Sequence, residues 1–214
     1  ICLAIFVAGY LAERRELIAA GTWTVGRLHL PEPRDMLPLM LAWGVSVVVM
    51  VGEKDLGSSL LFFMLFVVLL WVATEKTSYL AVGISLFAIG AVLAYNAFDH
   101  VRDRVDIWLD PWSRYSGKGY QIVQGMFALG AGGISGSGLG KGNPTRIPAA
   151  QNDFIFAAIG EELGLLGCTA VLTAFVLLIG AGLRTASRTQ RPFEQLLSTG
   201  LTLILGLQAF IIIG

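Results

Sequence analysis

The stretch IPAAQNDFIFAAIGEELGLLG, residues 147–167, leads from a polar segment directly into a long apolar run. At about 1.5 Å per residue, a helix over 164–182 would cross most of a hydrocarbon core of roughly 30 Å. Pro148 and the Asn/Asp cap candidates that follow it predict that this helix begins near Asn152. The stretch therefore predicts a membrane-spanning helix with a polar mouth.

Three acids lie at this mouth, Asp153, Glu161 and Glu162. A helix turns about 100° per residue, so Asp153 and Glu161 would share one side, roughly 80° and 12 Å apart, with Glu162 on the opposite side. Ionisable groups at such a place belong in water or in a wet cavity, where they are commonly functional. The alternative is that they only cap the helix start and complement its dipole.

The composition of the whole chain is that of a polytopic membrane protein. Of 214 residues, 55% are hydrophobic and only 14% are charged, and the mean hydropathy is +0.72. These values are far too apolar for an ordinary soluble domain. We expect one all-α integral-membrane domain over residues 1–214. Because the sequence starts and stops inside apolar runs, we expect it to be a piece of a longer protein.

The apolar runs predict a series of membrane helices. We expect the end of one helix at 1–12 and further spans at 36–52, 56–73, 78–98, 164–182 and from 196 onward. Polar connections are expected at 13–35, 53–55, 74–77, 99–152 and 183–195. Basic residues in short connections mark the cytoplasmic side, and Arg184, Arg188 and Arg191 lie in one of them. This bias predicts that residues 99–152 form an extracytoplasmic loop.

The segment 99–152 has an aromatic first half and a glycine-rich second half. Trp108, Trp112, Tyr115 and Tyr120 are residues typical of a membrane interface. The glycines in GAGGISGSGLGKG could expose N–H groups to phosphate, with Lys141 and Arg146 nearby, although the spacing matches neither a Walker loop nor a dinucleotide fingerprint. The alternative is a loop whose glycines allow close backbone packing against helices.

A mixed charge cluster begins the same segment, formed by Asp99, Arg102, Asp103, Arg104, Asp106 and Asp110. It could be a solvated helix end with internal ion pairs. Alternatively, its arginines could bind a diphosphate. A third charged group, Glu53-Lys54-Asp55, would lie on the same outer side and fits an ordinary connection between two spans.

Four motifs in order resemble the RodA/FtsW (SEDS) family of bacterial cell-wall proteins. They are GEKDLGSSL at 52–60, RVDIWLDPWSRYSGKGYQIVQ at 104–124, GGISGSGLGKG at 132–142 and NDFIFAAIGEELGLLG at 152–167. The resemblance implies a bundle of about ten helices in the bacterial cytoplasmic membrane, of which this chain would be a central portion. It also implies a peptidoglycan glycosyltransferase that polymerises lipid II and works with a class B penicillin-binding protein. Neither an organic cofactor nor a nucleic-acid partner is implied.

The resemblance also implies roles for particular residues. The essential outer aspartate of the family matches Asp153, and the aspartate of its DLG motif matches Asp55. The GYQ of the loop matches Gly119, Tyr120 and Gln121, and the Gly-Glu-Glu-Leu-Gly variants of the last motif match Glu161 and Glu162. Where the family often has Gln-Pro before Asp-Leu-Gly, this chain has Glu53-Lys54. The loop is slightly more similar to the elongation branch, RodA, than to the division branch.

The implied chemistry matches the charged residues. A sugar hydroxyl must lose its proton to a general base, a role that we assign to Asp153, and a lipid diphosphate must leave. Cations stabilise that leaving group; the candidates are Arg102, Arg104, Lys141 and Arg146, together with Lys54, Asp55, Tyr120, Gln121 and Glu161 as substrate ligands. A Mg²⁺ or Mn²⁺ ion would be shared between carboxylates and phosphates. A lipid II flippase or transporter, or a non-catalytic scaffold for a transpeptidase, are the alternatives.

Overall fold

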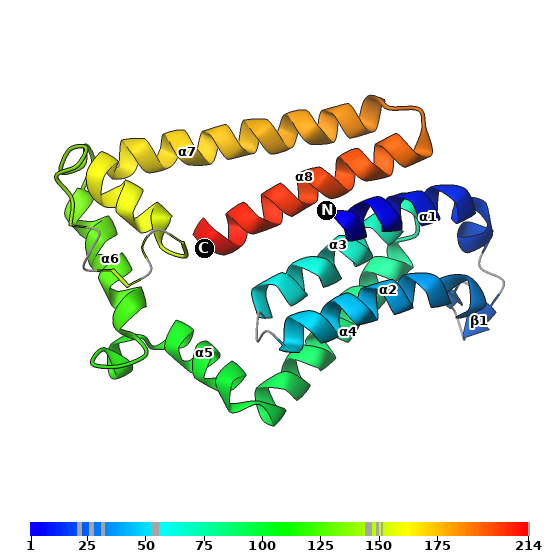
Figure 1. Cartoon of the computed structure of the whole chain (residues 1–214), viewed down its shortest axis with the longest axis horizontal. Helices are drawn as coiled ribbons and strands as arrows, with labels where there is room; N and C mark the ends of the chain where they lie inside the picture. The colour runs from blue at the N-terminus through cyan, green and yellow to red at the C-terminus, as the bar shows by residue number, and fades with distance from the viewer. Residues whose placement is uncertain are drawn as a thin grey trace. The chain divides into compact units, whose positions relative to one another are not determined.

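The structure is a computed structural model that describes residues 1–20, 23–25, 28–30, 33–52, 56–143, 147–148, 150 and 152–213. It is helical apart from one short antiparallel hairpin of β1 (Trp23–Val25) and β2 (Leu28–Leu30), in which Trp23 pairs with Leu30. The helices, shown in Figure 1, are α1 (Cys2–Ala20), α2 (Pro33–Gly52), α3 (Leu56–Thr74), α4 (Thr77–Ala97), α5 (Asp99–Leu109), the 3-10 turn η1 (Trp112–Arg114), α6 (Tyr120–Gly132), α7 (Ile155–Arg188) and α8 (Pro192–Ile213).

Four of the described helices are long and apolar enough to cross a membrane. The qualifying segments are Gly57–Thr74, Thr77–Ala97, Ile155–Arg188 and Pro192–Ile213. They confirm the spans predicted at 56–73, 78–98, 164–182 and from 196 onward. The span predicted at 36–52 is helical as α2, with a shorter apolar segment at Leu37–Ser46. The chain is therefore a multi-pass membrane protein with a helical bundle fold.

The chain forms two compact units. The first comprises Ile1–Phe87 and Leu178–Gln208, and the second comprises Ala88–Leu177 and Ala209–Gly214. Large apolar side chains from α1, α2, α3 and α8 form the core of the first unit; those that are almost completely buried include Leu11, Ile18, Leu39, Leu65, Leu69 and Leu196. The described candidate site residues all belong to the second unit.

The predicted connection at 13–35 is wrong at both ends, because α1 continues to Ala20 and α2 begins at Pro33. Glu and Arg are good helix formers, and Ile18 is buried two turns after Leu11 on the same face of the helix. Arg15 Nη2 also lies 2.7 Å from Glu75 Oε1, in the turn between α3 and α4. This ion pair places the end of α1 beside that turn, as expected for two connections on the same side of the membrane.

The helix after residue 152 also differs from the prediction. It begins at Ile155 instead of near Asn152, so Asp153 lies in the preceding turn. Its backbone then leaves the helical conformation at Gly164, with φ 66° and ψ −164°. Only glycine adopts such a conformation readily. The helix α7 therefore consists of two segments, 155–163 and 165–188.

The glycine-rich loop, residues 133–143, packs against this break. Its N–H groups donate to carbonyl oxygens at the end of the first segment, from Ser137 to Glu161 (2.9 Å) and from Gly138 to Glu162 (3.0 Å). Ser137 Oγ also donates to the Glu161 carbonyl, at 2.9 Å. Carbonyls at a helix end have no partner within the helix, so the loop supplies the missing donors.

In the second segment of α7 the direction of the hydrogen bonds is reversed: the helix donates and the loop accepts. Its first N–H groups donate to loop carbonyls, from Leu165 to Gly133 (2.9 Å) and from Leu166 to Ile134 (3.1 Å). Because both sides of the break bond to the same loop, the loop replaces the hydrogen bonds that the helix loses at Gly164.

The loop approaches α7 so closely that Gly136 cannot carry a side chain. A Cβ atom there would lie 2.1 Å from the carbonyl oxygen of Glu162, and the residue has φ +78°. Gly136→Ala should lower the free energy of unfolding by at least about 1–2 kcal/mol from the left-handed backbone alone, and the clash adds to this. Thermal unfolding of the full-length protein in detergent, followed by size-exclusion chromatography, measures the loss.

Two glycines serve as matched controls. Gly133 also has a positive φ, of +54°, but a Cβ there meets nothing within 4 Å, so Gly133→Ala reports backbone strain without the clash. Gly130 is helical with open space around it, and Gly130→Ala should be neutral or stabilising by about 0.5–1 kcal/mol. Equal stability of the Gly136 and Gly130 variants would contradict the packing of the loop on α7.

Candidate functional site

Asp153 is exposed in the turn that precedes α7. Within the described residues its carboxylate accepts no hydrogen bond, and the preceding Asn152 is exposed as well, whereas the following Phe154 is partly buried. Ile147 and Ala150 are buried, and together with Ala128 of α6 and Ala157 of α7 they form a small hydrophobic core. The exposed carboxylate therefore lies between this small core and the partly buried Phe154.

The helix α6 forms the other side of this core, and its small residues let α7 approach closely. A Cβ on Gly125 would lie 2.7 Å from Cδ1 of Phe154, the residue after Asp153. A Cβ on Gly132 would lie 1.8 Å from the carbonyl oxygen of Gly160. Gly125 and Gly132 were not singled out in the sequence analysis, and their partners on the other side of the contact could not be identified from the sequence alone.

Gln121, at the start of α6, contacts the chain at Pro148, five residues before Asp153. Its side-chain nitrogen Nε2 donates to the carbonyl oxygen of Pro148 at 2.7 Å. The neighbouring Tyr120 is exposed, and its ring centroid lies 5.8 Å from that of Tyr115. The structure thus places the predicted substrate ligand Gln121 against the chain itself.

Two pockets formed by described residues lie beside this segment. The larger, of about 270 Å³, is lined by apolar side chains that include Ala150, Ile155 and Leu163, and by the charged Glu162. The smaller, of about 90 Å³, has Glu161 in its wall. Because Ala150 and Ile155 lie on either side of Asp153 in the chain, the larger pocket is close to the candidate base.

Glu161 and Glu162 both contact the glycine-rich loop, and the prediction that they point to opposite sides is wrong. Asn143 N–H donates to Glu161 Oε1 at 3.0 Å, and Gly140 N–H donates to Glu162 Oε2 at 3.1 Å. Both carboxylates reach the loop because it wraps around the end of the segment 155–163, where α7 breaks. The loop amides that could have bound phosphate are used in part to hold these acids.

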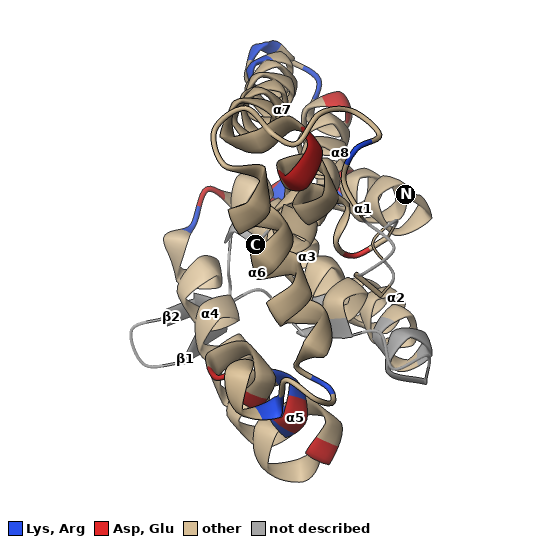
Figure 2. Cartoon of the chain, turned by 90° about the vertical axis from the view of Figure 1, so that its left-hand side faces the viewer, with Lys and Arg blue, Asp and Glu red and all other residues tan. Residues whose placement is uncertain are grey.

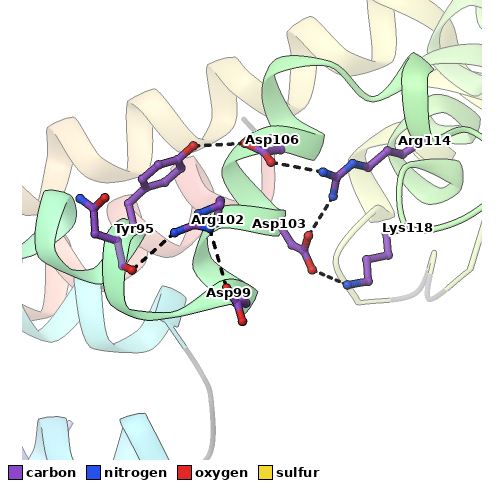
Figure 3. Close-up of polar contacts among 8 residues, drawn as sticks. Tyr95, Asp99, Arg102, Asp103, Asp106, Arg114 and Lys118 are labelled. Atoms are coloured by element: carbon purple, nitrogen blue, oxygen red, sulfur yellow. Dashed lines mark hydrogen bonds and ion pairs between the residues drawn. The ribbon is translucent and has the colours of Figure 1, made fainter.

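The charge cluster of α5 is largely an internal ion-pair network, shown in Figure 3. Arg114 donates to Asp103 Oδ1 at 2.8 Å and to Asp106 Oδ2 at 3.2 Å. Lys118 also pairs with Asp103, and Tyr95 hydroxyl donates to Asp106 at 3.4 Å. Hydrogen bonds from Lys118 and Arg114 lower the pKa of Asp103. The network therefore stabilises the fold at neutral pH, and this contribution is lost when acid protonates Asp103.

The predicted diphosphate-binding cations differ in how they are held. Arg102 donates to the carbonyl oxygen of Asn96 at 3.4 Å, and its guanidinium carbon lies 5.6 Å from the centroid of the Tyr95 ring. Arg104 and Lys141 are exposed, and neither forms an ion pair with another described residue. Figure 2 shows acidic and basic residues side by side on α5. Of these three cations, Arg104 and Lys141 are the freer to bind an anion.

Three predicted site residues, Lys54, Asp55 and Arg146, lie outside the described residues. The expected divalent cation stays a prediction, since no three His, Cys, Asp or Glu side chains of the described part converge on a common point. Sequence reasoning missed the structural roles of Arg114, which lies in the turn η1, and of Lys118, which follows it; their aspartate partners on α5 lie 8 to 15 residues earlier in the chain.

Comparison with known proteins gives matches over the whole chain. The family model described as "Cell cycle protein", for FtsW, RodA and SpoVE, matches residues 1–214. The chain is 49% identical over 215 residues to "Peptidoglycan glycosyltransferase RodA" of Mycobacterium tuberculosis (strain ATCC 25618 / H37Rv), covering 100% of this chain and 46% of that protein. The RodA of Mycobacterium leprae is 47% identical with the same coverage. "Probable peptidoglycan glycosyltransferase FtsW" of Geobacter sulfurreducens (strain ATCC 51573 / DSM 12127 / PCA) is 35% identical over 178 residues, 82% of this chain and 48% of that protein.

The fold has a counterpart among solved structures. A chain of the structure described as "Structural coordination of polymerization and crosslinking by a peptidoglycan synthase complex" superposes with a TM-score of 0.65 at 21% identity, covering 99% of this chain and 70% of that one. The present chain spans about half the length of the curated relatives it matches. Since the family model covers the chain from end to end, the chain belongs to the FtsW, RodA and SpoVE family of membrane proteins.

Proposed function

We propose that this chain is part of a peptidoglycan glycosyltransferase that polymerises lipid II in the bacterial cytoplasmic membrane. The observation that carries the proposal is the similarity, close to half of all positions along the entire chain, to proteins named peptidoglycan glycosyltransferase RodA. The higher identity to RodA than to FtsW proteins favours the elongation branch. The exposed carboxylate on a packed turn is the chemical feature that such an enzyme needs.

In this proposal Asp153 is the general base. A sugar hydroxyl of one substrate attacks the anomeric carbon of the other, the bond from that carbon to the diphosphate oxygen breaks, and the lipid diphosphate leaves. Asp153 takes the proton of the attacking hydroxyl. A single displacement inverts the anomeric centre, as in inverting glycoside chemistry. An exposed carboxylate without a cationic partner among the described residues is free to accept that proton.

The leaving diphosphate needs positive charge. Arg104 and Lys141 are exposed and form no ion pair within the described residues, so both can turn toward a phosphate. Arg102 is held by a carbonyl and an aromatic ring, which suits an auxiliary contribution. A Mg²⁺ or Mn²⁺ ion would enter with the diphosphate and take carboxylate oxygens as additional ligands.

The proposal also includes a side of the membrane and a partner. The segment 99–152 would lie outside the cytoplasm, where lipid-linked sugars are polymerised, and its exposed Trp108 and Trp112 suit the interface between lipid and water. The similar solved structure is described as a peptidoglycan synthase complex that coordinates polymerisation and crosslinking. A class B penicillin-binding protein is therefore the partner that we propose.

The first test replaces the base. Asp153→Asn keeps the shape of the side chain and removes its basicity, so polymerisation of lipid II by the full-length protein with its transpeptidase should fall by about 10²-fold or more. Gel analysis of labelled glycan strands measures this, and co-purification of the transpeptidase shows that the variant remains folded.

Asp99→Asn is the matched control, because the Asp99 side chain is fully exposed and its ion pair with Arg102 is long, at 3.9 Å. It should polymerise at the parental rate. Full activity of Asp153→Asn would contradict the assignment of Asp153 as the general base. Transfer of lipid II between leaflets without glycan synthesis by the parent would instead favour a flippase.

The second test concerns the free cations. Arg104→Gln and Lys141→Gln should each lower kcat/KM for lipid II by about tenfold, because a hydrogen bond to a charged group contributes roughly 1.5–3 kcal/mol. Steady-state polymerisation kinetics measure the change. Lys76→Gln is the control, because Lys76 lies in the turn between α3 and α4, away from the candidate site in the sequence. It should leave kcat/KM unchanged. An equal effect of all three substitutions would indicate a nonspecific effect of lost charge.

A further inference from the structure

Gln121 of α6 makes a side-chain hydrogen bond to the segment before α7. Its Nε2 lies 2.7 Å from the carbonyl oxygen of Pro148, so one donor of the amide is used by the protein backbone. We propose that Gln121 is a positioning residue, which holds the turn of Asp153 by its hydrogen bond to Pro148 instead of contacting substrate. This inference rests on the proposed function, in which Asp153 is the base.

The same face of α6 holds the turn at a second point. Gln121 and Gly125 are four residues apart, and Ala128 follows three residues later, so all three lie on one face of the helix. The ring of Phe154 lies against Gly125 so closely that a Cβ there would be 2.7 Å from Cδ1 and 2.9 Å from Cε1. Phe154 therefore packs directly on the backbone of α6.

Asp153 lies between these two anchors in the chain. The Pro148 carbonyl is fixed by Gln121 on one side, and the Phe154 ring is fixed by Gly125 on the other. The Asp153 side chain is exposed and accepts no hydrogen bond from another described residue, so its position depends on the backbone. A displacement of about 1 Å at a reacting group can cost as much as 10²-fold in rate.

The other two residues of the GYQ motif also serve the local structure. A Cβ on Gly119 would lie 2.3 Å from the carbonyl oxygen of Pro111, so only glycine fits at the start of α6. Tyr120 packs beside Tyr115. Gly119 and Tyr120 thus fix the start of α6, and Gln121 donates to Pro148 from this position. In this inference the GYQ motif has a structural role and needs no contact with substrate.

The experiment compares Gln121→Met with Gln124→Met in the full-length protein, reconstituted with its transpeptidase. Methionine keeps the length of glutamine and removes the donor. Gln124 is a matched control for the exchange measurement, because its amide donates to the Tyr115 hydroxyl at 3.4 Å and not to the segment before Asp153. Because Gln124 lines the same pocket as Glu161, its kinetics are not used as a control. Two quantities are measured: hydrogen exchange of the 147–154 segment without substrate, and kcat and KM for lipid II polymerisation.

We expect Gln121→Met to speed hydrogen exchange in 147–154 and to lower kcat by about tenfold, with KM within about twofold of the parent. Gln124→Met should leave the exchange of 147–154 unchanged. A raised KM with unchanged kcat and unchanged exchange would make Gln121 a substrate ligand and overturn the inference. Unchanged exchange and unchanged kinetics would overturn it as well.

The hydrogen-exchange measurement separates this inference from the proposed function. If Asp153→Asn stays fully active, the assignment of the base fails. Faster exchange of 147–154 in Gln121→Met would still support the hold of Gln121 on this turn, and parental exchange would refute it.

Discussion

The second unit depends on the exchange of backbone hydrogen bonds between the glycine-rich loop and the break in α7. Away from water, each unpaired N–H or carbonyl group costs several kcal/mol, so a helix at the edge of a membrane cannot break at Gly164 without new partners. Ser137 and Gly138 supply donors to one segment, and Gly133 and Ile134 supply acceptors to the other. The loop and the break therefore supply each other's backbone hydrogen bonds, and the same loop also bonds the Glu161 and Glu162 carboxylates.

The small residues of α6 connect the break in α7 with the segment that carries the candidate base. Gly132 meets the backbone of Gly160, just before the break, and Gly125 meets Phe154, just after Asp153. One short helix thus contacts both ends of the segment 155–163. Because one contact is between backbone and backbone and the other between backbone and ring, neither glycine of α6 can carry a side chain without a clash. These contacts support a segment that is too short to be a stable helix alone.

Hydropathy alone predicted the spans of α3, α4, α7 and α8, because long apolar runs have few alternatives in a membrane. The acid before α7 was also visible in the sequence. The break at Gly164 was not, because it depends on donors from a loop more than twenty residues earlier in the chain. The same holds for Arg114, which lies in the turn η1 and pairs with Asp103 and Asp106, 11 and 8 residues earlier on α5. The local hydropathy pattern thus predicted the membrane helices, whereas the contacts around the candidate site depend on hydrogen bonds between residues far apart in the sequence.

The distribution of charge then separates structural from chemical groups. Asp103 and Asp106 pair with Arg114 and Lys118 within one network. These acids therefore cannot act as free bases, and these cations could neutralise a diphosphate only if their ion pairs with the acids were broken. Asp153 has no such partner among the described residues. A carboxylate next to a fixed cation would be a weaker base, since the cation favours its ionised form. Within the described part of the chain, the ion pairs of this unit therefore lie between α5 and the residues that follow it, and Asp153 takes no part in them.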